Sequence, residues 1–215
     1  MNGVVQGMLD GYQLLINGAS APLLYISANQ INAVAPWEVV HASSVSVTLV
    51  TPSGTFRLAD LSIRPSEPEV FREPVSGYAA AINQDGTPNS PTNPARAGEI
   101  VSVWGTGSGM PICGDCNVDG AIVPGVDFLE YPVLPVSIIA NYGRPSDGTT
   151  NSDSLEIDYA GPSPGEVFGL LQVNFRLPQP LPYGIGPPSV EFDSLAVSLQ
   201  VGSATSAGVL IYVAQ

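Results

Sequence analysis

Short runs of alternating apolar and polar residues, separated by turn-forming residues, recur along the whole chain. Residues 45–50 read VSVTLV, so an extended backbone places two valines and a leucine on one face. Residues 12–16 (YQLLI) run into Asn17-Gly18, the strongest two-residue signal for a β-hairpin. No window of a dozen residues has apolar residues at helical spacing without a glycine or proline inside it. The pattern predicts an all-β fold.

A degenerate internal repeat divides this pattern into two similar halves. Residues 21–37 (APLLYISANQINAVAPW) contain two short apolar runs that are closed by a proline. Residues 155–178 (LEIDYAGPSPGEVFGLLQVNFRLP) repeat the arrangement, with Tyr159 in the place of Tyr25. Each half contains several short strand patterns bounded by turn signals. We therefore expect two tandem Ig-like β-sandwich domains.

Both copies of the repeat carry a glutamine and an asparagine on either side of a β-branched residue. These residues are Gln30 and Asn32 in the first copy, and Gln172 and Asn174 in the second. In a strand, residues two apart lie on the same face, and amides that face inward need hydrogen-bond partners. We expect them to bond to the backbone of the loop that precedes the closing proline. They are thus predicted to lock a structural corner.

A proline-rich, charged connector at residues 64–73 separates the two halves, so we place the domains at residues 1–68 and 69–215. In the second domain, residues 98–105 (GEIVSVWG) form a strand pattern ahead of the repeat, whereas nothing equivalent precedes Tyr12. The first sandwich is therefore expected to lack its opening strand. An open sheet edge of this kind invites strand addition from another chain. The alternative is that residues upstream of this start point supply the strand.

The charge is small in amount and strongly one-sided. The chain has 19 acidic and 6 basic residues, a net charge of −13, and no lysine. A polyanion such as nucleic acid, or an anionic membrane surface, would be repelled. There is no apolar run long enough for a membrane span and no signal peptide at residues 1–10. The protein is thus expected to be intracellular, or to have its export segment outside this stretch.

An acidic loop at residues 106–131 interrupts the second domain and holds both cysteines, Cys113 and Cys116. A c-type haem site would need a following histidine, and a zinc site would need a second pair of ligands. The favoured interpretation is a small disulfide loop formed in an oxidising compartment. A redox-active pair is the alternative, although no βαβ pattern surrounds it.

The same loop reproduces the opening of a calcium-binding loop. Asp115, Asn117 and Asp119 alternate and are followed by glycine, as in the D-x-N-x-D-G pattern. The twelfth position, where a bidentate carboxylate belongs, is Val126, and Asp127 comes one place late. The loop is therefore either a calcium site with these three residues and Asp127 as ligands, or an acidic turn tied by the cysteine bridge.

Three long stretches resemble the Solibacter-type C-terminal domain family of secreted bacterial proteins. They are residues 17–38 (NGASAPLLYISANQINAVAPWE), 79–109 (AAAINQDGTPNSPTNPARAGEIVSVWGTGSG) and 158–178 (DYAGPSPGEVFGLLQVNFRLP). The resemblance covers nearly the whole chain from about Leu9. It implies a C-terminal module of a larger exported protein, built from Ig-like units of the IPT/TIG sort. The family usually has a strand-forming segment before the point where this chain starts, and it has no assigned activity or catalytic residues.

The side chains that carry chemistry do not form a recognisable catalytic pattern. His41 has no nucleophile on a strained turn near it in the sequence, so we expect a surface histidine. Glu156 and Asp158 share one face of a strand, which we expect to be solvated rather than to hold a sugar. Trp104 lies inside an apolar strand and is expected in the core. Trp37, at a strand end, is the candidate for contact with a ligand.

The sequence therefore predicts a non-enzymatic, extracellular or cell-surface structural module. We expect a subunit of a filament or surface layer that associates with its neighbours through the open sheet edge. The alternative is a carbohydrate- or protein-binding adhesion module at the C-terminus of a larger secreted protein. No cofactor other than the calcium ion is expected.

Overall fold

The computed structural model of the chain describes residues 3–110, 118–125, 132–144, 149–181 and 193–214. Within these residues the fold is all-β, as predicted: strands alternate with turns, and helix is limited to one 3-10 turn, η1 (Trp37–Val39). No helix in this part of the chain is long and apolar enough to cross a membrane.

The chain divides into two compact units that are not contiguous in sequence. Unit 1 comprises Met1–Pro65, Met110–Tyr131 and Pro162–Leu170, and unit 2 comprises Ser66–Gly109, Pro132–Gly161 and Leu171–Gln215. The division predicted from the sequence, at residues 1–68 and 69–215, differs from this at two segments. Both segments connect strands of unit 2 but pack with unit 1. Strand periodicity gives no signal for this, because it describes strands and not the packing of the loops between them.

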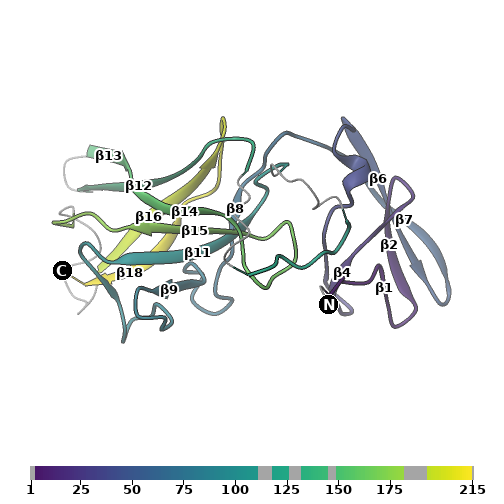
Figure 1. Ribbon diagram of the computed structural model, residues 1–215, viewed down its shortest axis with the longest axis horizontal. Coiled ribbons are helices and arrows are strands. Elements are labelled where there is room, and N and C mark those ends of the chain that lie inside the picture. The colour runs from purple at the N-terminus through teal and green to yellow at the C-terminus, as the bar shows by residue number, and fades with distance from the viewer. Residues whose placement is uncertain (1–2, 111–117, 126–131, 145–148, 182–192, 215) are drawn as a thin grey trace. The chain divides into compact units, whose positions relative to one another are not determined.

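Unit 2 is a two-layer β-sandwich (Figure 1). One sheet has the order β10-β18-β16-β12-β13, with β17 paired to β16. Its strands are β10 (Ala95–Arg96), β12 (Val136–Arg144), β13 (Thr149–Ser154), β16 (Asp193–Val201), β17 (Ala204–Thr205) and β18 (Val209–Ala214). The other sheet has the order β14-β15-β11-β8, with β9 paired to β11. Its strands are β8 (Glu69–Val70), β9 (Ala81–Asn83), β11 (Ile100–Thr106), β14 (Ile157–Pro162) and β15 (Leu171–Arg176).

The two sheets of unit 2 enclose one continuous apolar core. Alternate residues of each strand point inward, so β11 and β15 both show a regular succession of buried and half-buried positions. Phe175 from one sheet and Ile138, Leu195 and Ile211 from the other are fully buried in the same cluster. Unit 2 therefore has both layers of a sandwich in place.

Unit 1 has one well-formed sheet, with the order β1-β2-β6-β7 and β3 paired to β2. These strands are β1 (Met8–Leu9), β2 (Tyr12–Ile16), β3 (Ala19–Ala21), β6 (Ser44–Thr51) and β7 (Gly54–Ser62). Among the described residues, the named strands of the facing layer are those of the two-stranded sheet of β4 (Leu23–Ile26) and β5 (Ile31–Ala33). Leu14, Ala21, Leu23 and Val47 form a core much smaller than that of unit 2.

Backbone hydrogen bonds extend this second layer beyond β4, on the side away from β5. The Leu23 N–H donates to the Gln6 carbonyl at 2.9 Å, and the Val5 N–H donates to the Gly120 carbonyl at 2.8 Å. The Val123 N–H in turn donates to the Glu166 carbonyl at 2.8 Å. Residues 5 and 6 therefore lie next to β4, and the two inserted segments follow them in order. β5 lies at the opposite edge of the layer.

The strands of the two units follow the same order along the chain. β2, β4, β5, β6 and β7 of unit 1 correspond to β12, β14, β15, β16 and β18 of unit 2, and β2–β6 pairs antiparallel as β12–β16 does. The strand that precedes β12 is β11, which pairs with β15. The strand that precedes β2 is β1, which pairs with β2 itself and not with β5. Among the described residues, unit 1 has no counterpart of β11, as the repeat predicted.

Candidate functional site

The free edge of β5 is the most distinctive feature of unit 1. The Gln30 carbonyl accepts the Ser27 N–H at 2.8 Å, and the Val34 N–H bonds at 3.0 Å to the residue before β4. In an antiparallel strand, alternate residues direct their N–H and C=O groups to opposite edges. The backbone groups of Ile31 and Ala33 therefore point away from β4, and no described strand pairs with them.

In unit 2 the equivalent edge is occupied. β15 lies between β14 and β11, and β11 pairs antiparallel from Ile100 opposite Arg176 to Gly105 opposite Leu171. Val103 is opposite Val173, which holds the place of Ile31 in the repeat. The free edge of β5 thus corresponds to the position that β11 fills in unit 2.

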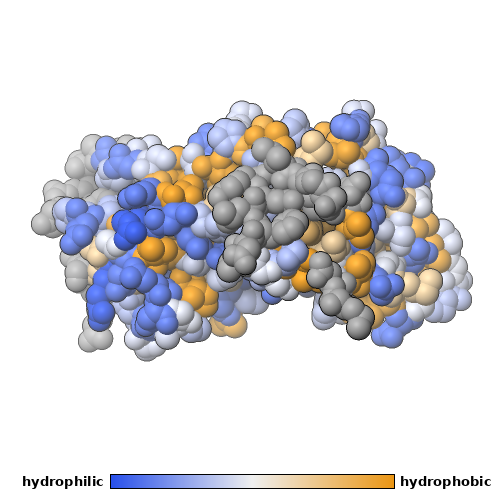
Figure 2. Space-filling model, in the orientation of Figure 1, coloured by the Kyte–Doolittle hydropathy of each residue, from blue (hydrophilic) through white to orange (hydrophobic). Residues whose placement is uncertain are grey.

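A second feature of unit 1 is the exposed inner face of β7. Phe56 is paired with Leu49, and Leu61 is paired with Val45. Directly opposite residues share a face of the sheet, and Val45 and Leu49 face the inner side, so Phe56 and Leu61 face it too. Both residues are nevertheless 51% exposed. Apolar residues form part of the visible surface of the molecule, shown in orange in Figure 2.

The corresponding strand of unit 2 is covered. Val209, Ile211 and Val213 of β18 are between 0% and 1% exposed beneath the sheet that contains β11. In β7 a bulge places Leu58 out of register, and Leu58 is 52% exposed. The opposite face of β7 is polar and carries an ion pair between Arg57 and Asp60. The exposed apolar side of β7 is therefore the side that would face a further strand of the second layer.

The four predicted corner residues form the same hydrogen bond twice. Gln30 Nε2 donates to Asn32 Oδ1 at 2.7 Å, and Gln172 Nε2 donates to Asn174 Oδ1 at 2.9 Å. The expected direction was wrong, because these amides lie on the outer side of their strands while Ile31 and its counterpart pack inward. Gln172 and Asn174 are half-buried beside β11, whereas Gln30 and Asn32 are exposed.

β11 also corrects the expectation for Trp104. Its buried residues are Val101, Val103 and Gly105, so Trp104 lies on the outer face and is half-buried there, opposite Gln172. Both faces of the strand carry apolar residues, and an apolar run alone does not reveal which residues point inward.

Trp37 belongs to a small cluster in unit 1 with Val123 and Phe168 and is half-buried. Its backbone N–H opens η1 and donates to Asp119 Oδ1 at 2.8 Å. Burial raises the pKa of Asp119 above its ordinary value; the Trp37 N–H opposes this shift, and the neighbouring Glu38 carboxylate adds to it. Asp119 therefore anchors the start of η1, and ligand contact by Trp37 stays a prediction.

The other residues of the predicted disulfide and calcium loop, Cys113, Cys116, Asp115, Asn117 and Asp127, lie outside the described residues. The disulfide and the calcium site therefore stay predictions. In the part of the chain that the structure describes, no group of three or more His, Cys, Asp or Glu side chains is placed to hold a metal ion.

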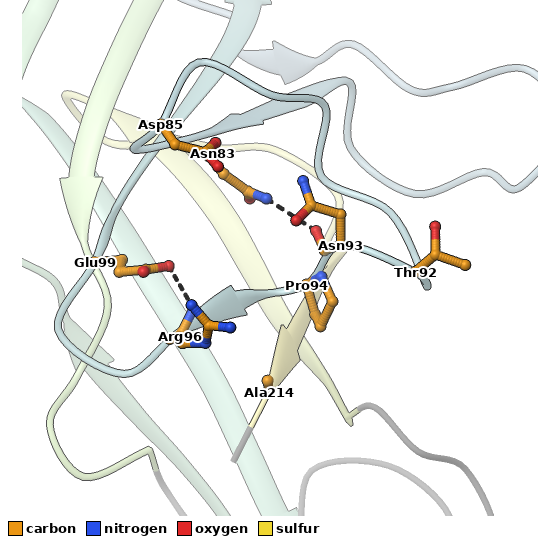
Figure 3. Close-up of a pocket in the computed structure, with 8 residues that line it drawn as sticks. All are labelled: Asn83, Asp85, Thr92, Asn93, Pro94, Arg96, Glu99 and Ala214. Carbon is orange, nitrogen blue, oxygen red and sulfur yellow. Dashed lines mark hydrogen bonds between the residues drawn. The ribbon is translucent and has the colours of Figure 1, made fainter.

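Unit 2 contains a small polar cavity of about 150 Å³ (Figure 3). It is lined by Asn83, Asp85, Thr92, Asn93, Pro94, Arg96, Glu99 and Ala214. Asn83 Nδ2 donates to the Asn93 carbonyl at 2.9 Å, and the Arg96 N–H donates to Glu99 Oε2 at 2.8 Å. Small-molecule sites usually enclose about 300–1,000 Å³. The cavity is smaller than that, and several of its polar groups are used to hold the surrounding loop.

The carboxylates considered for sugar hydrolysis form an ion-pair group instead. Arg176 lies 3.8 Å from Glu156 and 3.3 Å from Asp158, and it also donates to the Gly98 carbonyl at 3.0 Å. His41 is exposed in a turn. These contacts give Glu156 and Asp158 a shared ion-pair partner, and the single charge of the Arg176 guanidinium balances one of their two negative charges.

The exposed apolar residues of β7 were not predicted from the sequence. The segment FRLADL does contain a signal, because its apolar residues 56, 58 and 61 do not follow the strict alternation of a half-buried strand. No family model, curated protein or solved structure matches this chain. The candidate site therefore depends on the fold and on the comparison between the two units.

Proposed function

We propose that the protein is a non-enzymatic structural module whose copies join by strand addition. An extended segment of a neighbouring copy pairs with the free edge of β5 and covers the inner face of β7. Repeated addition joins copies into a filament or surface layer. The observation that carries this proposal is the free edge of β5, since its counterpart β15 is paired on both sides.

The exposed apolar residues supply a driving force for such an addition. Burying a large apolar side chain completely contributes about 1.5–3 kcal/mol, so covering a side chain that is half exposed contributes roughly 1 kcal/mol. Phe56 and Leu61, which face the inner side of the sheet, are each 51% exposed. Edge hydrogen bonds to Ile31 and Ala33 add directionality, because they form only with an extended partner.

Three further observations support a structural role outside the cell. The described candidates for catalysis are bonded within the fold or stand alone in a turn: Glu156 and Asp158 share Arg176, and His41 is exposed. The net charge of −13 disfavours a nucleic acid partner. The resemblance to modules of secreted bacterial proteins, built from Ig-like units, points to the same class of function.

Sedimentation velocity at about 1–100 µM, followed by negative-stain microscopy, tests the proposal over the range in which specific protein complexes usually form. We expect the wild-type mass to rise with concentration. Ala33→Pro removes an edge N–H and Phe56→Lys places a charge on the inner face, so both variants should stay monomeric.

Thr55→Lys is the matched control, because Thr55 lies next to Phe56 on the polar face of the same strand and receives the same charge. It should assemble like the wild type. Melting curves confirm that each variant is folded. A wild-type chain that is monomeric throughout, or a Phe56→Lys variant that assembles normally, would overturn the proposal.

A further inference from the structure

We infer that the segment accepted by unit 1 has a defined direction, register and residue pattern, which β11 displays in unit 2. The segment runs antiparallel to β5, presents small or β-branched residues inward at alternate positions, and places an aromatic residue opposite Gln30. This inference rests on the proposed function and names the chemistry of its partner: an extended, uncharged segment with the pattern of residues 100–105.

The direction follows from the repeat. β4 and β5 are antiparallel, and β11 is antiparallel to β15, the counterpart of β5. The groups of Ile31 and Ala33 that point to the free edge match those of β15 that bond to β11, because Val173 holds the place of Ile31. A strand added in the same direction as β11 repeats an arrangement that this sequence already forms.

The inward positions require small side chains. In β11 they are Val101, Val103 and Gly105, which are buried together with the residues of β18. In unit 1 the added residues would meet Phe56, which is larger than any inward residue of β18, and Leu61, which is larger than the valines of β18. A larger inward residue on the added strand would therefore overfill the layer.

The outward-facing residues of the added strand are specified by the two amides that they would lie opposite. Trp104 is opposite Gln172 and Ser102 is opposite Asn174, and both amides are half-buried there. Gln30 and Asn32 are held in the same bonded arrangement, but they are exposed. An aromatic residue opposite Gln30 and a small polar residue opposite Asn32 would cover the pair in the register that β11 uses, and a shift by one residue would exchange the two faces of the added strand.

A synthetic peptide with the sequence of residues 98–106 (GEIVSVWGT) carries the required pattern and serves as the probe. Its binding to the full chain is measured by fluorescence anisotropy at concentrations where the chain is monomeric. Replacing Val101→Asp and Val103→Asp in the peptide should weaken binding at least about tenfold, since charges then face the apolar layer. In the chain, Phe56→Lys should also weaken it at least about tenfold, whereas Thr55→Lys should change it less than about twofold.

Hydrogen exchange locates the bound peptide. The amides of Ile31 and Ala33 should exchange at least about tenfold more slowly when it binds, while the Asn32 amide, which faces β4, should change little. Protection along β7 would mean that the peptide adds to the other free edge, and altered exchange along β15 would mean that it replaces β11. Either result overturns the inference, as does equal binding of the peptide that carries the aspartates.

The two proposals can fail separately. Copies that self-associate but do not bind the peptide would leave strand addition between neighbours intact and overturn the inferred pattern. A chain that binds the peptide on β5 but stays monomeric would support the pattern and overturn assembly between copies.

Discussion

The backbone N–H of Trp37 donates a 2.8 Å hydrogen bond to Asp119 Oδ1, a residue 82 positions further along the chain. Trp37 opens η1, and the preceding residue, Pro36, provides no side-chain cap. The loop that contains Asp119 thus supplies the cap that the local sequence lacks. This relationship ties a segment inserted between two strands of unit 2 to the centre of unit 1.

Removing this cap should destabilise unit 1. Asp119→Ala leaves the Trp37 N–H without its acceptor, and we expect its free energy of unfolding to fall by about 1 kcal/mol. Asp119→Asn keeps an oxygen at the same position and should have a much smaller effect. Urea denaturation followed by tryptophan fluorescence measures both, and equal destabilisation by the two variants would contradict a role in capping.

The wild type and the Asp119→Asn variant also test how the stability of unit 1 depends on pH. The pKa of Asp119 lies above its ordinary value of 3.8, mainly because of burial. Its charged form is therefore disfavoured in the folded state, so its contribution to stability is greatest below the unfolded pKa and declines as the pH rises to the folded pKa. Relative to Asp119→Asn, the wild type should gain stability when the pH falls from about 7 to about 4. A wild type that loses stability relative to Asp119→Asn on acidification would contradict the sign of this shift.

A close backbone contact in unit 2 predicts that Gly107 cannot be replaced by a residue with a side chain. Gly107 has φ +74, and a Cβ there would lie 1.8 Å from the Glu67 carbonyl oxygen. Gly107→Ala should therefore lower the stability of unit 2 by roughly 3 kcal/mol or more. Gly86 has φ +81 with open space around it, so Gly86→Ala should cost only about 1 kcal/mol of backbone strain. Thermal denaturation compares the two, and equal losses would show that the contact with Glu67 is unimportant.

In unit 2 the side chain of Asn89 bonds to both backbone groups of one residue, as the backbone of a neighbouring strand would. Its Nδ2 donates to the Tyr212 carbonyl at 2.8 Å, and its Oδ1 accepts the Tyr212 N–H at 2.8 Å. Asn89→Ala should lower the stability of unit 2 by about 2 kcal/mol, because the N–H and the C=O of Tyr212 both lose their hydrogen bond to this side chain. Asn29→Ala, at an exposed turn, is the control and should change stability by less than about 0.5 kcal/mol. Hydrogen exchange at the Tyr212 amide should quicken only in the Asn89 variant.

The sequence predicted the strands well where alternation is strict. The run at residues 45–50 lies within β6, and the run at residues 98–105 overlaps β11. It also predicted that unit 1 lacks a counterpart of β11, and no described strand fills that position, because an internal repeat lets one half of the chain be compared with the other. These properties are local or are shared between the copies, and so they are visible in one sequence.

The properties that depend on distant packing were not predicted. The amides of Gln30 and Asn32 face outward because Ile31 is needed in the core, and the exposure of Phe56 depends on which strand lies across from it. The bond between Trp37 and Asp119 joins segments with no shared periodicity. Such features require the positions of both partners in space, which the order of residues does not express.

The discontinuity of unit 1 has a consequence for synthesis on the ribosome. Val123 bonds to Glu166, and Trp37 packs against Phe168, so the last contacts of unit 1 cannot form until residue 168 has been translated. By then β11 to β14 of unit 2 have already been made. Domains usually fold one after another as the chain emerges. Here the first unit must wait for part of the second, and the two must fold in an interleaved order.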